Sequence, residues 1–377
     1  MRYYLVAGEA SGDLHGSNLI KGLKSIDKEA EFRCWGGDLM ASEGAVLVKH
    51  YKESAIMGFV EVLTHIKKIA YNLKECKKDI KEYNPNVLIL IDYPGFNFRI
   101  AEFAKQNKIK VFYYIAPKVW AWKENRVNKL RMFTDRVFII FPFEVDYFKK
   151  KGINAIYKGN PLLDSVDNYK YNAESRNDFC KRVNISPDKP IIALLAGSRK
   201  GEISYLLPRM ICVAKRFDEY RFILAGAPSI EKNYYTSFLE KSNSKIELLS
   251  GETYSILHHA KAAIISSGTA SLEAALLKVP QVVCYGGNEI TYQIAKKLVK
   301  LKYISLANLI MNKGIFKELI QHKCTPNNIA AELQLLLNDN VYREKMLKDF
   351  NDVREILGGK GASDKVAAAM LEELGKM

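Results

Sequence analysis

The chain has 377 residues, of which 48% are hydrophobic and 26% are charged, so it has ample apolar material for a folded core. Its length favours two domains, because single cores stop growing near roughly 250–300 residues. The formal net charge of +15 indicates an anionic partner, and nucleic acid, anionic lipid and phosphorylated substrate are all candidates beside the alternative of a merely lysine-rich proteome.

The sequence lacks the features of a membrane-spanning or disulfide-bonded chain. No stretch reaches the ~18–20 uninterrupted apolar residues that a span needs, and the apolar run at the N-terminus is too short for a signal peptide. The six cysteines lie far apart and form no Cys-x-x-Cys pair, which favours free, mostly buried thiols. We therefore expect a cytosolic protein.

Short strands alternate with helical segments along the whole chain. In the first half, the predicted strands are Tyr3–Ala7, Phe32–Trp35, Val87–Asp92, Lys110–Tyr114 and Arg136–Ile140. In the second half, they are Ile191–Leu195, Arg221–Ala225, Ala263–Ser266 and Gln281–Tyr285. Near-continuous apolar strands separated by helices indicate α/β domains with parallel sheets covered on both faces. The polar stretch Asp164–Asn177 is the predicted linker between two Rossmann-like domains, and the chain after Pro326 is predicted to be mainly helical.

The loop Gly8–Gly16 follows the first strand and opens a helix. Its glycine spacing does not match the Gly-x-Gly-x-x-Gly dinucleotide fingerprint, and the chain contains no P-loop. Small residues here would let a ligand approach the helix amides, with Glu9 and Asp13 beside it. The alternative is a tight turn capped by Ser11 or Asp13.

The loop Asp92–Asn97 comes directly after the apolar strand that ends at Ile91. A carboxylate at the end of a buried strand is costly to desolvate without a partner or a task, so Asp92 is a candidate general base. The alternative is a carboxylate that caps the helix starting near Asn97.

The loop Ala116–Arg126 carries Trp120 and Trp122 among basic residues. Tryptophans in that setting suit a lipid interface or an acceptor surface, because each ring has one apolar and one polar side. Two core tryptophans with lysines pointing outward are the alternative.

In the second half, the strand before Gly197, Ser198 and Arg199 leads directly into a helix. Backbone amides, the helix dipole and a guanidinium would converge there on a diphosphate. The alternative is a surface arginine after an ordinary turn.

A second loop of this kind contains Ser267, Gly268 and Thr269, with Glu273 about one turn into the following helix. Hydroxyls and amides suit phosphate, and a carboxylate suits a ribose diol because it accepts two hydroxyl protons. An ordinary helix cap is the alternative. Two such helix starts with one carboxylate make a nucleotide site more credible than either loop alone.

The segment 55–70 is strongly apolar and then turns basic, and Lys74, Lys77, Lys78 and Lys81 follow it. An interfacial membrane segment has this pattern, with apolar side chains in lipid and cations on anionic headgroups. The alternative is an amphipathic helix that faces the core and exposes its lysines.

Metal-binding patterns are absent from the sequence. It has no His-Glu-x-x-His motif, no paired Cys/His spacing and no Asp-x-Asp tripeptide that would bridge a divalent ion to a diphosphate. We expect no metal, so that Arg199 and the helix N-termini neutralise a leaving diphosphate.

Taken in order, these motifs resemble lipid-A-disaccharide synthase, glycosyltransferase family 19. The matching segments are Gly8–Asp13, Met57–Leu63, Ile91–Asn97, Val119–Trp122, Gly197–Arg199, Ser267–Ala270 with Glu273, Leu298–Lys300, Tyr303–Leu309 and Lys317–Gln321. No single segment is diagnostic, but the ordered set spans nearly the whole chain. One departure is the stretch Tyr93–Phe96, where some members carry a second acid.

The resemblance implies a GT-B hexosyltransferase of lipid A and lipopolysaccharide biosynthesis, with two Rossmann-like domains and a cleft between them. Residues 1–165 with a C-terminal helix at about 352–377 would form the acceptor and membrane side, and 166–351 the UDP-sugar donor domain. The implied reaction transfers 2,3-diacylglucosamine from UDP-2,3-diacylglucosamine to 2,3-diacylglucosamine 1-phosphate, with inversion, to give a β-1,6-linked disaccharide 1-phosphate and UDP. The UDP-sugar is a co-substrate, no other cofactor is implied, and the enzyme would be peripheral on the cytosolic face of the inner membrane.

The resemblance also implies roles for individual residues. The implied catalytic residues are Asp92, Asp13 and Glu9. The implied nucleotide-side residues are Gly197, Ser198, Arg199, Ser267, Gly268, Thr269, Glu273, Asn308 and Gln321. Two alternatives are another GT-B UDP-sugar enzyme, either an epimerase or a transferase with a soluble acceptor, and a non-catalytic nucleotide- or RNA-binding protein. Against the last, aromatic residues do not alternate with basic ones as a stacking platform for nucleic acid requires. The oligomeric state is left open.

Overall fold

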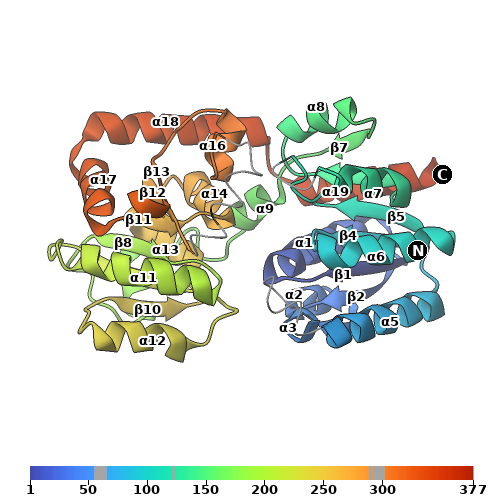
Figure 1. The fold of residues 1–377 in the computed structure, drawn as a ribbon, viewed down its shortest axis with the longest axis horizontal. Helices are drawn as coiled ribbons and strands as arrows, with labels where there is room; N and C mark the ends of the chain where they lie inside the picture. The colour runs from blue at the N-terminus through green and yellow to red at the C-terminus, as the bar shows by residue number, and fades with distance from the viewer. Residues whose placement is uncertain (55–65, 121–123, 288–291, 293–301, 377) are drawn as a thin grey trace. The chain divides into compact units, whose positions relative to one another are not determined.

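The computed structural model describes residues 1–54, 66–120, 124–287, 292 and 302–376 (Figure 1). The chain forms two compact units. Unit 1 contains Met1–Asp164 and Gly359–Met377, and unit 2 contains Ser165–Gly358. Residues 352–357, which the sequence analysis assigns to the first domain, continue a helix of unit 2, because α18 runs without a break over Asn340–Leu357.

Unit 1 is built on a seven-stranded parallel sheet of order β3-β2-β1-β4-β5-β6-β7. Its strands are β1 (Arg2–Ala7), β2 (Glu31–Gly36), β3 (Val46–His50), β4 (Val87–Ile91), β5 (Lys110–Tyr114), β6 (Arg136–Ile139) and β7 (Ala155–Tyr157). The central strand β4 has the sequence Val-Leu-Ile-Leu-Ile and is buried along its whole length. Such a strand needs apolar cover on both faces of the sheet.

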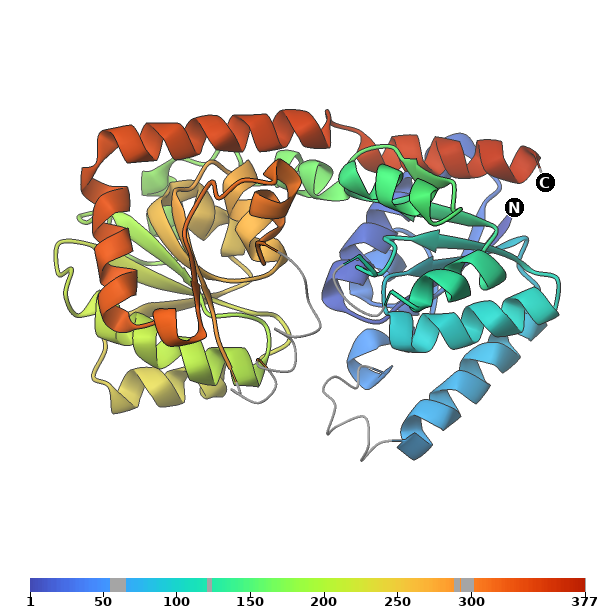
Figure 2. The same cartoon turned by 45° about the horizontal axis from the view of Figure 1, so that its top comes forward.

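Helices supply that cover. The helices of unit 1 are α1 (Ala10–Ile26), α2 (Asp38–Ser42), α3 (Tyr51–Ser54), α5 (Ile66–Tyr83), α6 (Pro94–Gln106), α7 (Arg126–Phe133), α8 (Phe143–Lys150), α9 (Pro161–Asp167, which continues into unit 2) and α19 (Ala362–Gly375). Alternate residues of the strands enter two separate apolar clusters, as expected for side chains that point to opposite faces. Helix α19 packs against α1, and its Val366, Ala367 and Met370 complete one of these clusters (Figure 2).

Unit 2 repeats the architecture with a six-stranded parallel sheet of order β10-β9-β8-β11-β12-β13. Its strands are β8 (Ile191–Leu195), β9 (Arg221–Gly226), β10 (Glu247–Ser250), β11 (Ala260–Ser266), β12 (Gln281–Tyr285) and β13 (Glu318–Ile320). Its helices are α10 (Arg176–Arg182), α11 (Lys200–Ala214), α12 (Lys232–Lys241), α13 (Thr253–His259), α14 (Thr269–Leu276), α16 (Leu306–Met311), the 3-10 turn η1 (Gln321–Lys323), α17 (Pro326–Asn338) and α18.

Each sheet reverses its strand order at one place. In unit 1 the reversal lies between β1 and β4, and in unit 2 between β8 and β11. Ligands of open α/β sheets bind outside the carboxyl ends of the strands at such a reversal. The loops that follow these four strands are the loops after Ala7, Ile91, Leu195 and Ser266, all of which the sequence analysis selected.

Candidate active site

Asp92 and Tyr93 follow β4 in an unusual backbone conformation. Both have positive φ angles, of 43° and 47°. Residues other than glycine pay for this conformation with steric strain, so the surrounding structure must hold them there. The carbonyl oxygen of Asp92 accepts hydrogen bonds from Asn97 Nδ2 at 2.8 Å and from the Tyr113 hydroxyl at 2.6 Å. Its amide donates to the carbonyl of Tyr114 at 3.1 Å.

The pKa of the Asp92 carboxyl group lies in the range that suits a general base near neutral pH. The residue is exposed to solvent, yet desolvation of the carboxyl group by the surrounding protein and then the Glu9 carboxylate raise its pKa to about 6. Lys118 and Arg126 act in the opposite direction. A carboxyl group with this pKa is mostly ionised at pH 7 and is a stronger base than an ordinary aspartate.

The two other predicted acids of unit 1 have different surroundings. Glu9 is half-buried at the N-cap of α1, close enough to Asp92 to raise the pKa of Asp92. Asp13 is 3% exposed, and its carboxylate accepts amide hydrogens from Gly37 at 2.8 Å, Leu39 at 3.1 Å and Met40 at 3.1 Å. These contacts cap α2, so Asp13 holds the loop after β2.

Gly8 is needed for packing beside the same loop. A Cβ atom on Gly8 would collide with the ring of Tyr93. That ring stacks on Phe96 with centroids 5.4 Å apart, and Phe96 stacks on Trp35 at 5.6 Å. The close approach that this glycine allows is therefore to Tyr93, directly after Asp92.

A buried carboxyl group that sequence reasoning missed lies beside the loop of Trp120. Glu144, at the start of α8, is 1% exposed; it accepts hydrogen bonds from Trp120 Nε1 at 2.9 Å and from the Phe141 amide at 3.1 Å. Burial raises the pKa of Glu144 to about 7. Trp120 is thus anchored inside unit 1, while Trp122 lies outside the described residues.

In unit 2, the turn after β8 holds an internal carboxylate. Gly197 has a φ of +106°, and Glu202 in the first turn of α11 accepts hydrogen bonds from the Ser198 amide at 3.2 Å and from Arg199 Nη1 at 3.1 Å. The side chain of Arg199 is 60% exposed. Glu202 therefore uses the Ser198 amide that was predicted for a phosphate, and leaves most of the Arg199 guanidinium open to solvent.

The turn after β11 is more open. A Cβ atom on Gly268 would meet no atom within 4 Å, and Ser267 and Thr269 on either side are half-buried. Glu273 in α14 accepts a hydrogen bond from the Tyr254 hydroxyl at 2.8 Å, and burial raises its pKa. A Cβ atom on Gly197 would lie 3.2 Å from the Ser266 hydroxyl, so the turns after β8 and β11 adjoin.

Two predicted nucleotide-side residues are engaged within unit 2. Asn308 is fully buried; its Nδ2 donates to Phe316 O and Glu318 Oε1, and its Oδ1 accepts from the amides of Ile315 and Phe316. Gln321 is buried and hydrogen-bonds both the amide and the carbonyl of Gly287. Both side chains are thus hydrogen-bonded to the protein itself, and Asn308 has no side-chain hydrogen-bonding atom left for a ligand.

Comparison with known proteins places this arrangement in one family. The family described as lipid-A-disaccharide synthetase matches residues 3–371. The lipid-A-disaccharide synthase of Geobacter metallireducens is 38% identical over 379 residues, covering 100% of this chain and 98% of that protein. The enzyme of Myxococcus xanthus is 36% identical over 377 residues, covering 99% and 97%. This chain belongs to the lipid-A-disaccharide synthase family.

Two solved structures of the same fold contain UDP-GlcNAc or UDP. A UDP-GlcNAc 2-epimerase from Neisseria meningitidis bound to UDP-GlcNAc has a TM-score of 0.71 and 14% identity, covering 99% of this chain and 100% of that one. The S. aureus MnaA–UDP co-structure has a TM-score of 0.69 and 15% identity, covering 100% and 97%. At such identities the likeness shows only the fold, and it confirms the prediction of an α/β GT-B architecture.

Membership of the lipid-A-disaccharide synthase family confirms the prediction of a glycosyltransferase. The alternative of a non-catalytic nucleotide- or RNA-binding protein is excluded, and the likeness to epimerases extends only to the fold. Two segments that carried the resemblance, Met57–Leu63 and Leu298–Lys300, lie outside the described residues. Among the described residues, no group of three or more His, Cys, Asp or Glu side chains could hold a metal ion.

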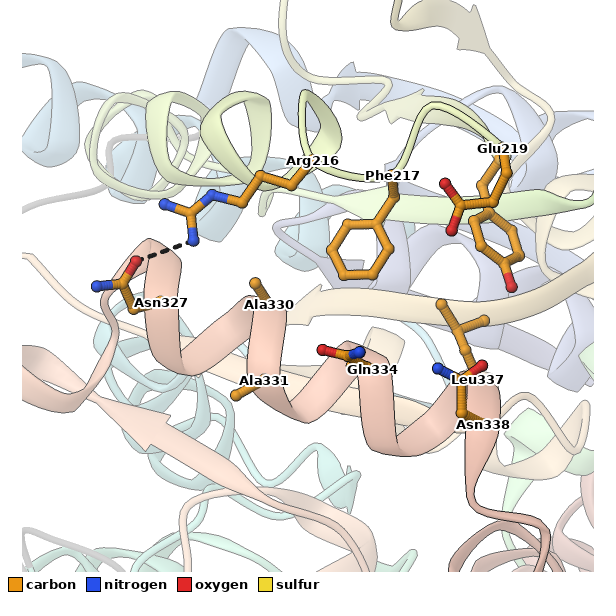
Figure 3. Close-up of a pocket in the computed structure, with 10 residues that line it drawn as sticks. Arg216, Phe217, Glu219, Asn327, Ala330, Ala331, Gln334, Leu337 and Asn338 are labelled. Carbon is orange, nitrogen blue, oxygen red and sulfur yellow. Dashed lines mark hydrogen bonds between the residues drawn. The ribbon is translucent and has the colours of Figure 1, made fainter.

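A cavity of about 440 Å³ in unit 2 lies apart from these loops (Figure 3). Its walls are the turn before β9, including Phe217 and Tyr220, and the helix α17, including Ala330 and Leu337. That turn lies at the amino end of β9, whereas the candidate loops of unit 2 follow the carboxyl ends of the strands. The cavity is therefore separate from the candidate site.

Proposed function

We propose that this chain transfers 2,3-diacylglucosamine from UDP-2,3-diacylglucosamine to the 6-hydroxyl of 2,3-diacylglucosamine 1-phosphate, with inversion and without a metal ion. The products are the β-1,6-linked disaccharide 1-phosphate and UDP. The observation that carries the proposed mechanism is Asp92, an exposed residue at the strand-order reversal of unit 1 whose carboxyl pKa is raised to about 6.

Asp92 is the proposed general base. The acceptor 6-oxygen attacks the anomeric carbon, the bond from that carbon to the β-phosphate oxygen breaks, and the electron pair leaves with UDP. The hydroxyl proton passes to Asp92 while the new bond forms, because a free sugar hydroxyl is far less acidic than a carboxyl group. A positioned base contributes typically ~10²–10⁴-fold in rate. Glu9 supports this role because its charge raises the pKa of Asp92.

The UDP side of the proposal rests on the two adjoining turns of unit 2. The exposed guanidinium of Arg199 and the amides at the start of α14, next to Ser267, Gly268 and Thr269, would hold the diphosphate and stabilise the charge that develops on the leaving UDP. The carboxylate of Glu273 would accept hydrogen bonds from the ribose diol. Gly197 and Ser198 shape the turn that presents Arg199.

Three further predicted residues are proposed to position these groups. Asp13 caps α2 through three backbone amides. Asn308 holds the turn before β13, and Gln321 holds Gly287 after β12. For Asp13 and Asn308 this differs from the direct contact with substrate that the family resemblance implies, because Asp13 is buried against three backbone amides and the side-chain hydrogen-bonding atoms of Asn308 are already used within unit 2.

We propose that the protein works at the cytosolic surface of the inner membrane, where both lipid substrates reside. Helix α5 supports this location with a stripe of exposed residues, namely Lys67, Tyr71, Lys74, Lys78 and Lys81. Lysines near an anionic membrane surface contribute about 1 kcal/mol each. The predicted alternative also describes α5, since Cys76 and Ile80 face the core; residues 55–65 lie outside the described part of the chain.

Within the described residues, no helix is long and apolar enough to cross a bilayer. Cosedimentation with vesicles that contain phosphatidylglycerol, at low and high salt, tests whether the protein binds an anionic membrane surface. Binding that is absent at both salt concentrations would rule it out.

The reaction itself is tested by mass spectrometry of the purified protein with both diacylated substrates in detergent and excess EDTA. The wild type is expected to form the disaccharide 1-phosphate, and Asp92→Asn is expected to lose about 10²–10⁴-fold in kcat. An equally active Asp92→Asn variant would remove Asp92 from the base role but keep the reaction. A folded wild type that epimerises the UDP-sugar, or uses only acceptors without acyl chains, would overturn the proposed substrates.

A further inference from the structure

The direction in which the Asp92 side chain leaves the backbone depends on a strained conformation. Two consecutive residues, Asp92 and Tyr93, have positive φ angles directly after β4. Such a conformation is strained and persists only where neighbouring groups hold it. If the peptide between them relaxed, the Asp92 carboxylate would move relative to any acceptor hydroxyl.

The carbonyl oxygen of that peptide is held by two donors. The hydroxyl of Tyr113 donates to it at 2.6 Å, and Asn97 Nδ2 donates at 2.8 Å. The two donors differ in what else they do, because Asn97 Nδ2 also contacts the carbonyls of Ile91 at 3.2 Å and Val6 at 3.4 Å. Asn97 therefore joins β1 to β4, whereas the Tyr113 hydroxyl donates its single hydrogen to the carbonyl of Asp92 and has the Asn97 side chain beside it.

Tyr113 is well placed to remain a donor. It lies on β5, next to β4, with its ring fully buried in the same apolar cluster as Leu88 and Leu90. Burial and the nearby Asp92 carboxylate raise its pKa far above neutral, so the hydroxyl stays protonated. A buried ring has little freedom to turn, so the hydroxyl is held at a fixed place beneath the loop.

We propose that Tyr113 is a positioning residue for the reaction: its hydroxyl fixes the backbone of Asp92 and thereby aims the carboxylate. This inference rests on the proposed role of Asp92 as the base. Tyr113 itself is buried and makes no contact with substrate. Its loss should thus act on the chemical step and spare substrate binding, since a misplaced catalytic group lowers kcat even when binding is intact.

The neighbouring residue offers a matched control. Tyr114 lies on the same strand, points to the other face of the sheet and is also fully buried. Its hydroxyl has no hydrogen-bond partner among the described residues. Tyr113→Phe and Tyr114→Phe therefore remove the same atom from equally buried rings, and only the first removes a contact with Asp92.

The experiment measures kcat, KM for both substrates, the Kd of UDP and the melting temperature for both variants. Tyr113→Phe is expected to lower kcat about tenfold, with KM and the Kd of UDP within about twofold of wild type. Tyr114→Phe is expected to keep kcat within about twofold of wild type. Equal kcat values for the two variants would overturn the proposal, as would a loss of UDP binding and melting temperature that accompanies the fall in kcat.

A double-mutant cycle separates this inference from the proposed base role. Added to Asp92→Asn, the Tyr113→Phe change should cause no further loss of kcat, because the group that Tyr113 aims is gone. If Asp92→Asn is inactive but Tyr113→Phe matches wild type, only the positioning role fails. If Asp92→Asn is fully active, the base role fails and the positioning role fails with it.

Discussion

The two units present their sites in contrasting ways. In unit 1 the loop of Asp92 is strained and is hydrogen-bonded by buried side chains. The ring of its Tyr93 packs against Gly8 and stacks on Phe96. In unit 2 the turn at Gly268 faces open space, and the guanidinium of Arg199 is largely exposed. The difference suits the proposed chemistry, because a base must be aimed at one atom, whereas backbone amides and a guanidinium can hold a flexible diphosphate.

The largest expected effect concerns Glu144, which the packed interior of unit 1 keeps from solvent. Its folded-state pKa, about 7, lies above its ordinary value of 4.5. The folded state therefore binds the extra proton, and stability falls as pH rises from about 4.5 to about 7, by about 3 kcal/mol in total. Urea unfolding from pH 4.5 to 8 should show this slope in wild type and lose it in Glu144→Gln, whatever the absolute stability of the variant. A Glu144→Gln variant with the wild-type slope would contradict the burial argument.

Arg199 tests the open site of unit 2. Charge-assisted hydrogen bonds contribute about 1.5–3 kcal/mol, so Arg199→Ala should weaken UDP binding about 10- to 100-fold. Isothermal titration calorimetry gives the Kd. The matched control is Arg216→Ala. Arg216 precedes the amino end of β9, and its side chain contacts Asn327 (Figure 3). Equal losses of UDP affinity in the two variants would mean that UDP binding does not depend specifically on Arg199.

A pair of glycines compares the two units directly. Gly8→Ala places a methyl group against the Tyr93 ring and should destabilise unit 1 by about 1–3 kcal/mol. Gly268→Ala meets no atom within 4 Å, so stability should be unchanged while UDP binding weakens. Thermal unfolding and UDP titration measure both. A destabilised Gly268→Ala variant, or an undisturbed Gly8→Ala variant, would reverse the contrast between the units.

The smallest expected effect is on the pH dependence of kcat/KM. The base must be ionised, and its pKa is raised to about 6, so activity is present above that pH and falls as the pH decreases through it. We expect about half of the plateau value at pH 6. Glu9→Gln removes a charge that raises the pKa of Asp92, so the midpoint should move to lower pH. A midpoint that stays in place would remove Glu9 from the electrostatics of the base.

The sequence was sufficient to predict the centres of both sheets but not their edges. All of the predicted strands are present, and the four strands of the described residues that were missed are β3 and β7 of unit 1 and β10 and β13 of unit 2. These are the outermost strands of the two sheets. A central strand is buried on both faces and has a continuous apolar sequence, whereas edge strands are short or partly polar, as in Glu318–Ile320.

Which loops carry the site was predictable, but the contacts of single residues were not. Strand ends followed by helix starts selected the loops of Asp92, Arg199 and Gly268. The sequence could not show that Asp13 caps a helix 24 or more residues away, because that partner is supplied by the fold. Glu144 gave only a weak signal, a carboxylate close to the apolar run that ends at Phe143.

The position of α19 has a consequence for biosynthesis. Unit 2 has all of its elements once residue 357 has been made, but the core of unit 1 also needs Val366, Met370 and Leu374. On the ribosome, the apolar cluster that contains Leu19, Ile20 and Leu23 therefore stays incomplete while all of unit 2 is translated. Folding units generally form from the N-terminus onward during synthesis, and here the unit that begins first is completed last.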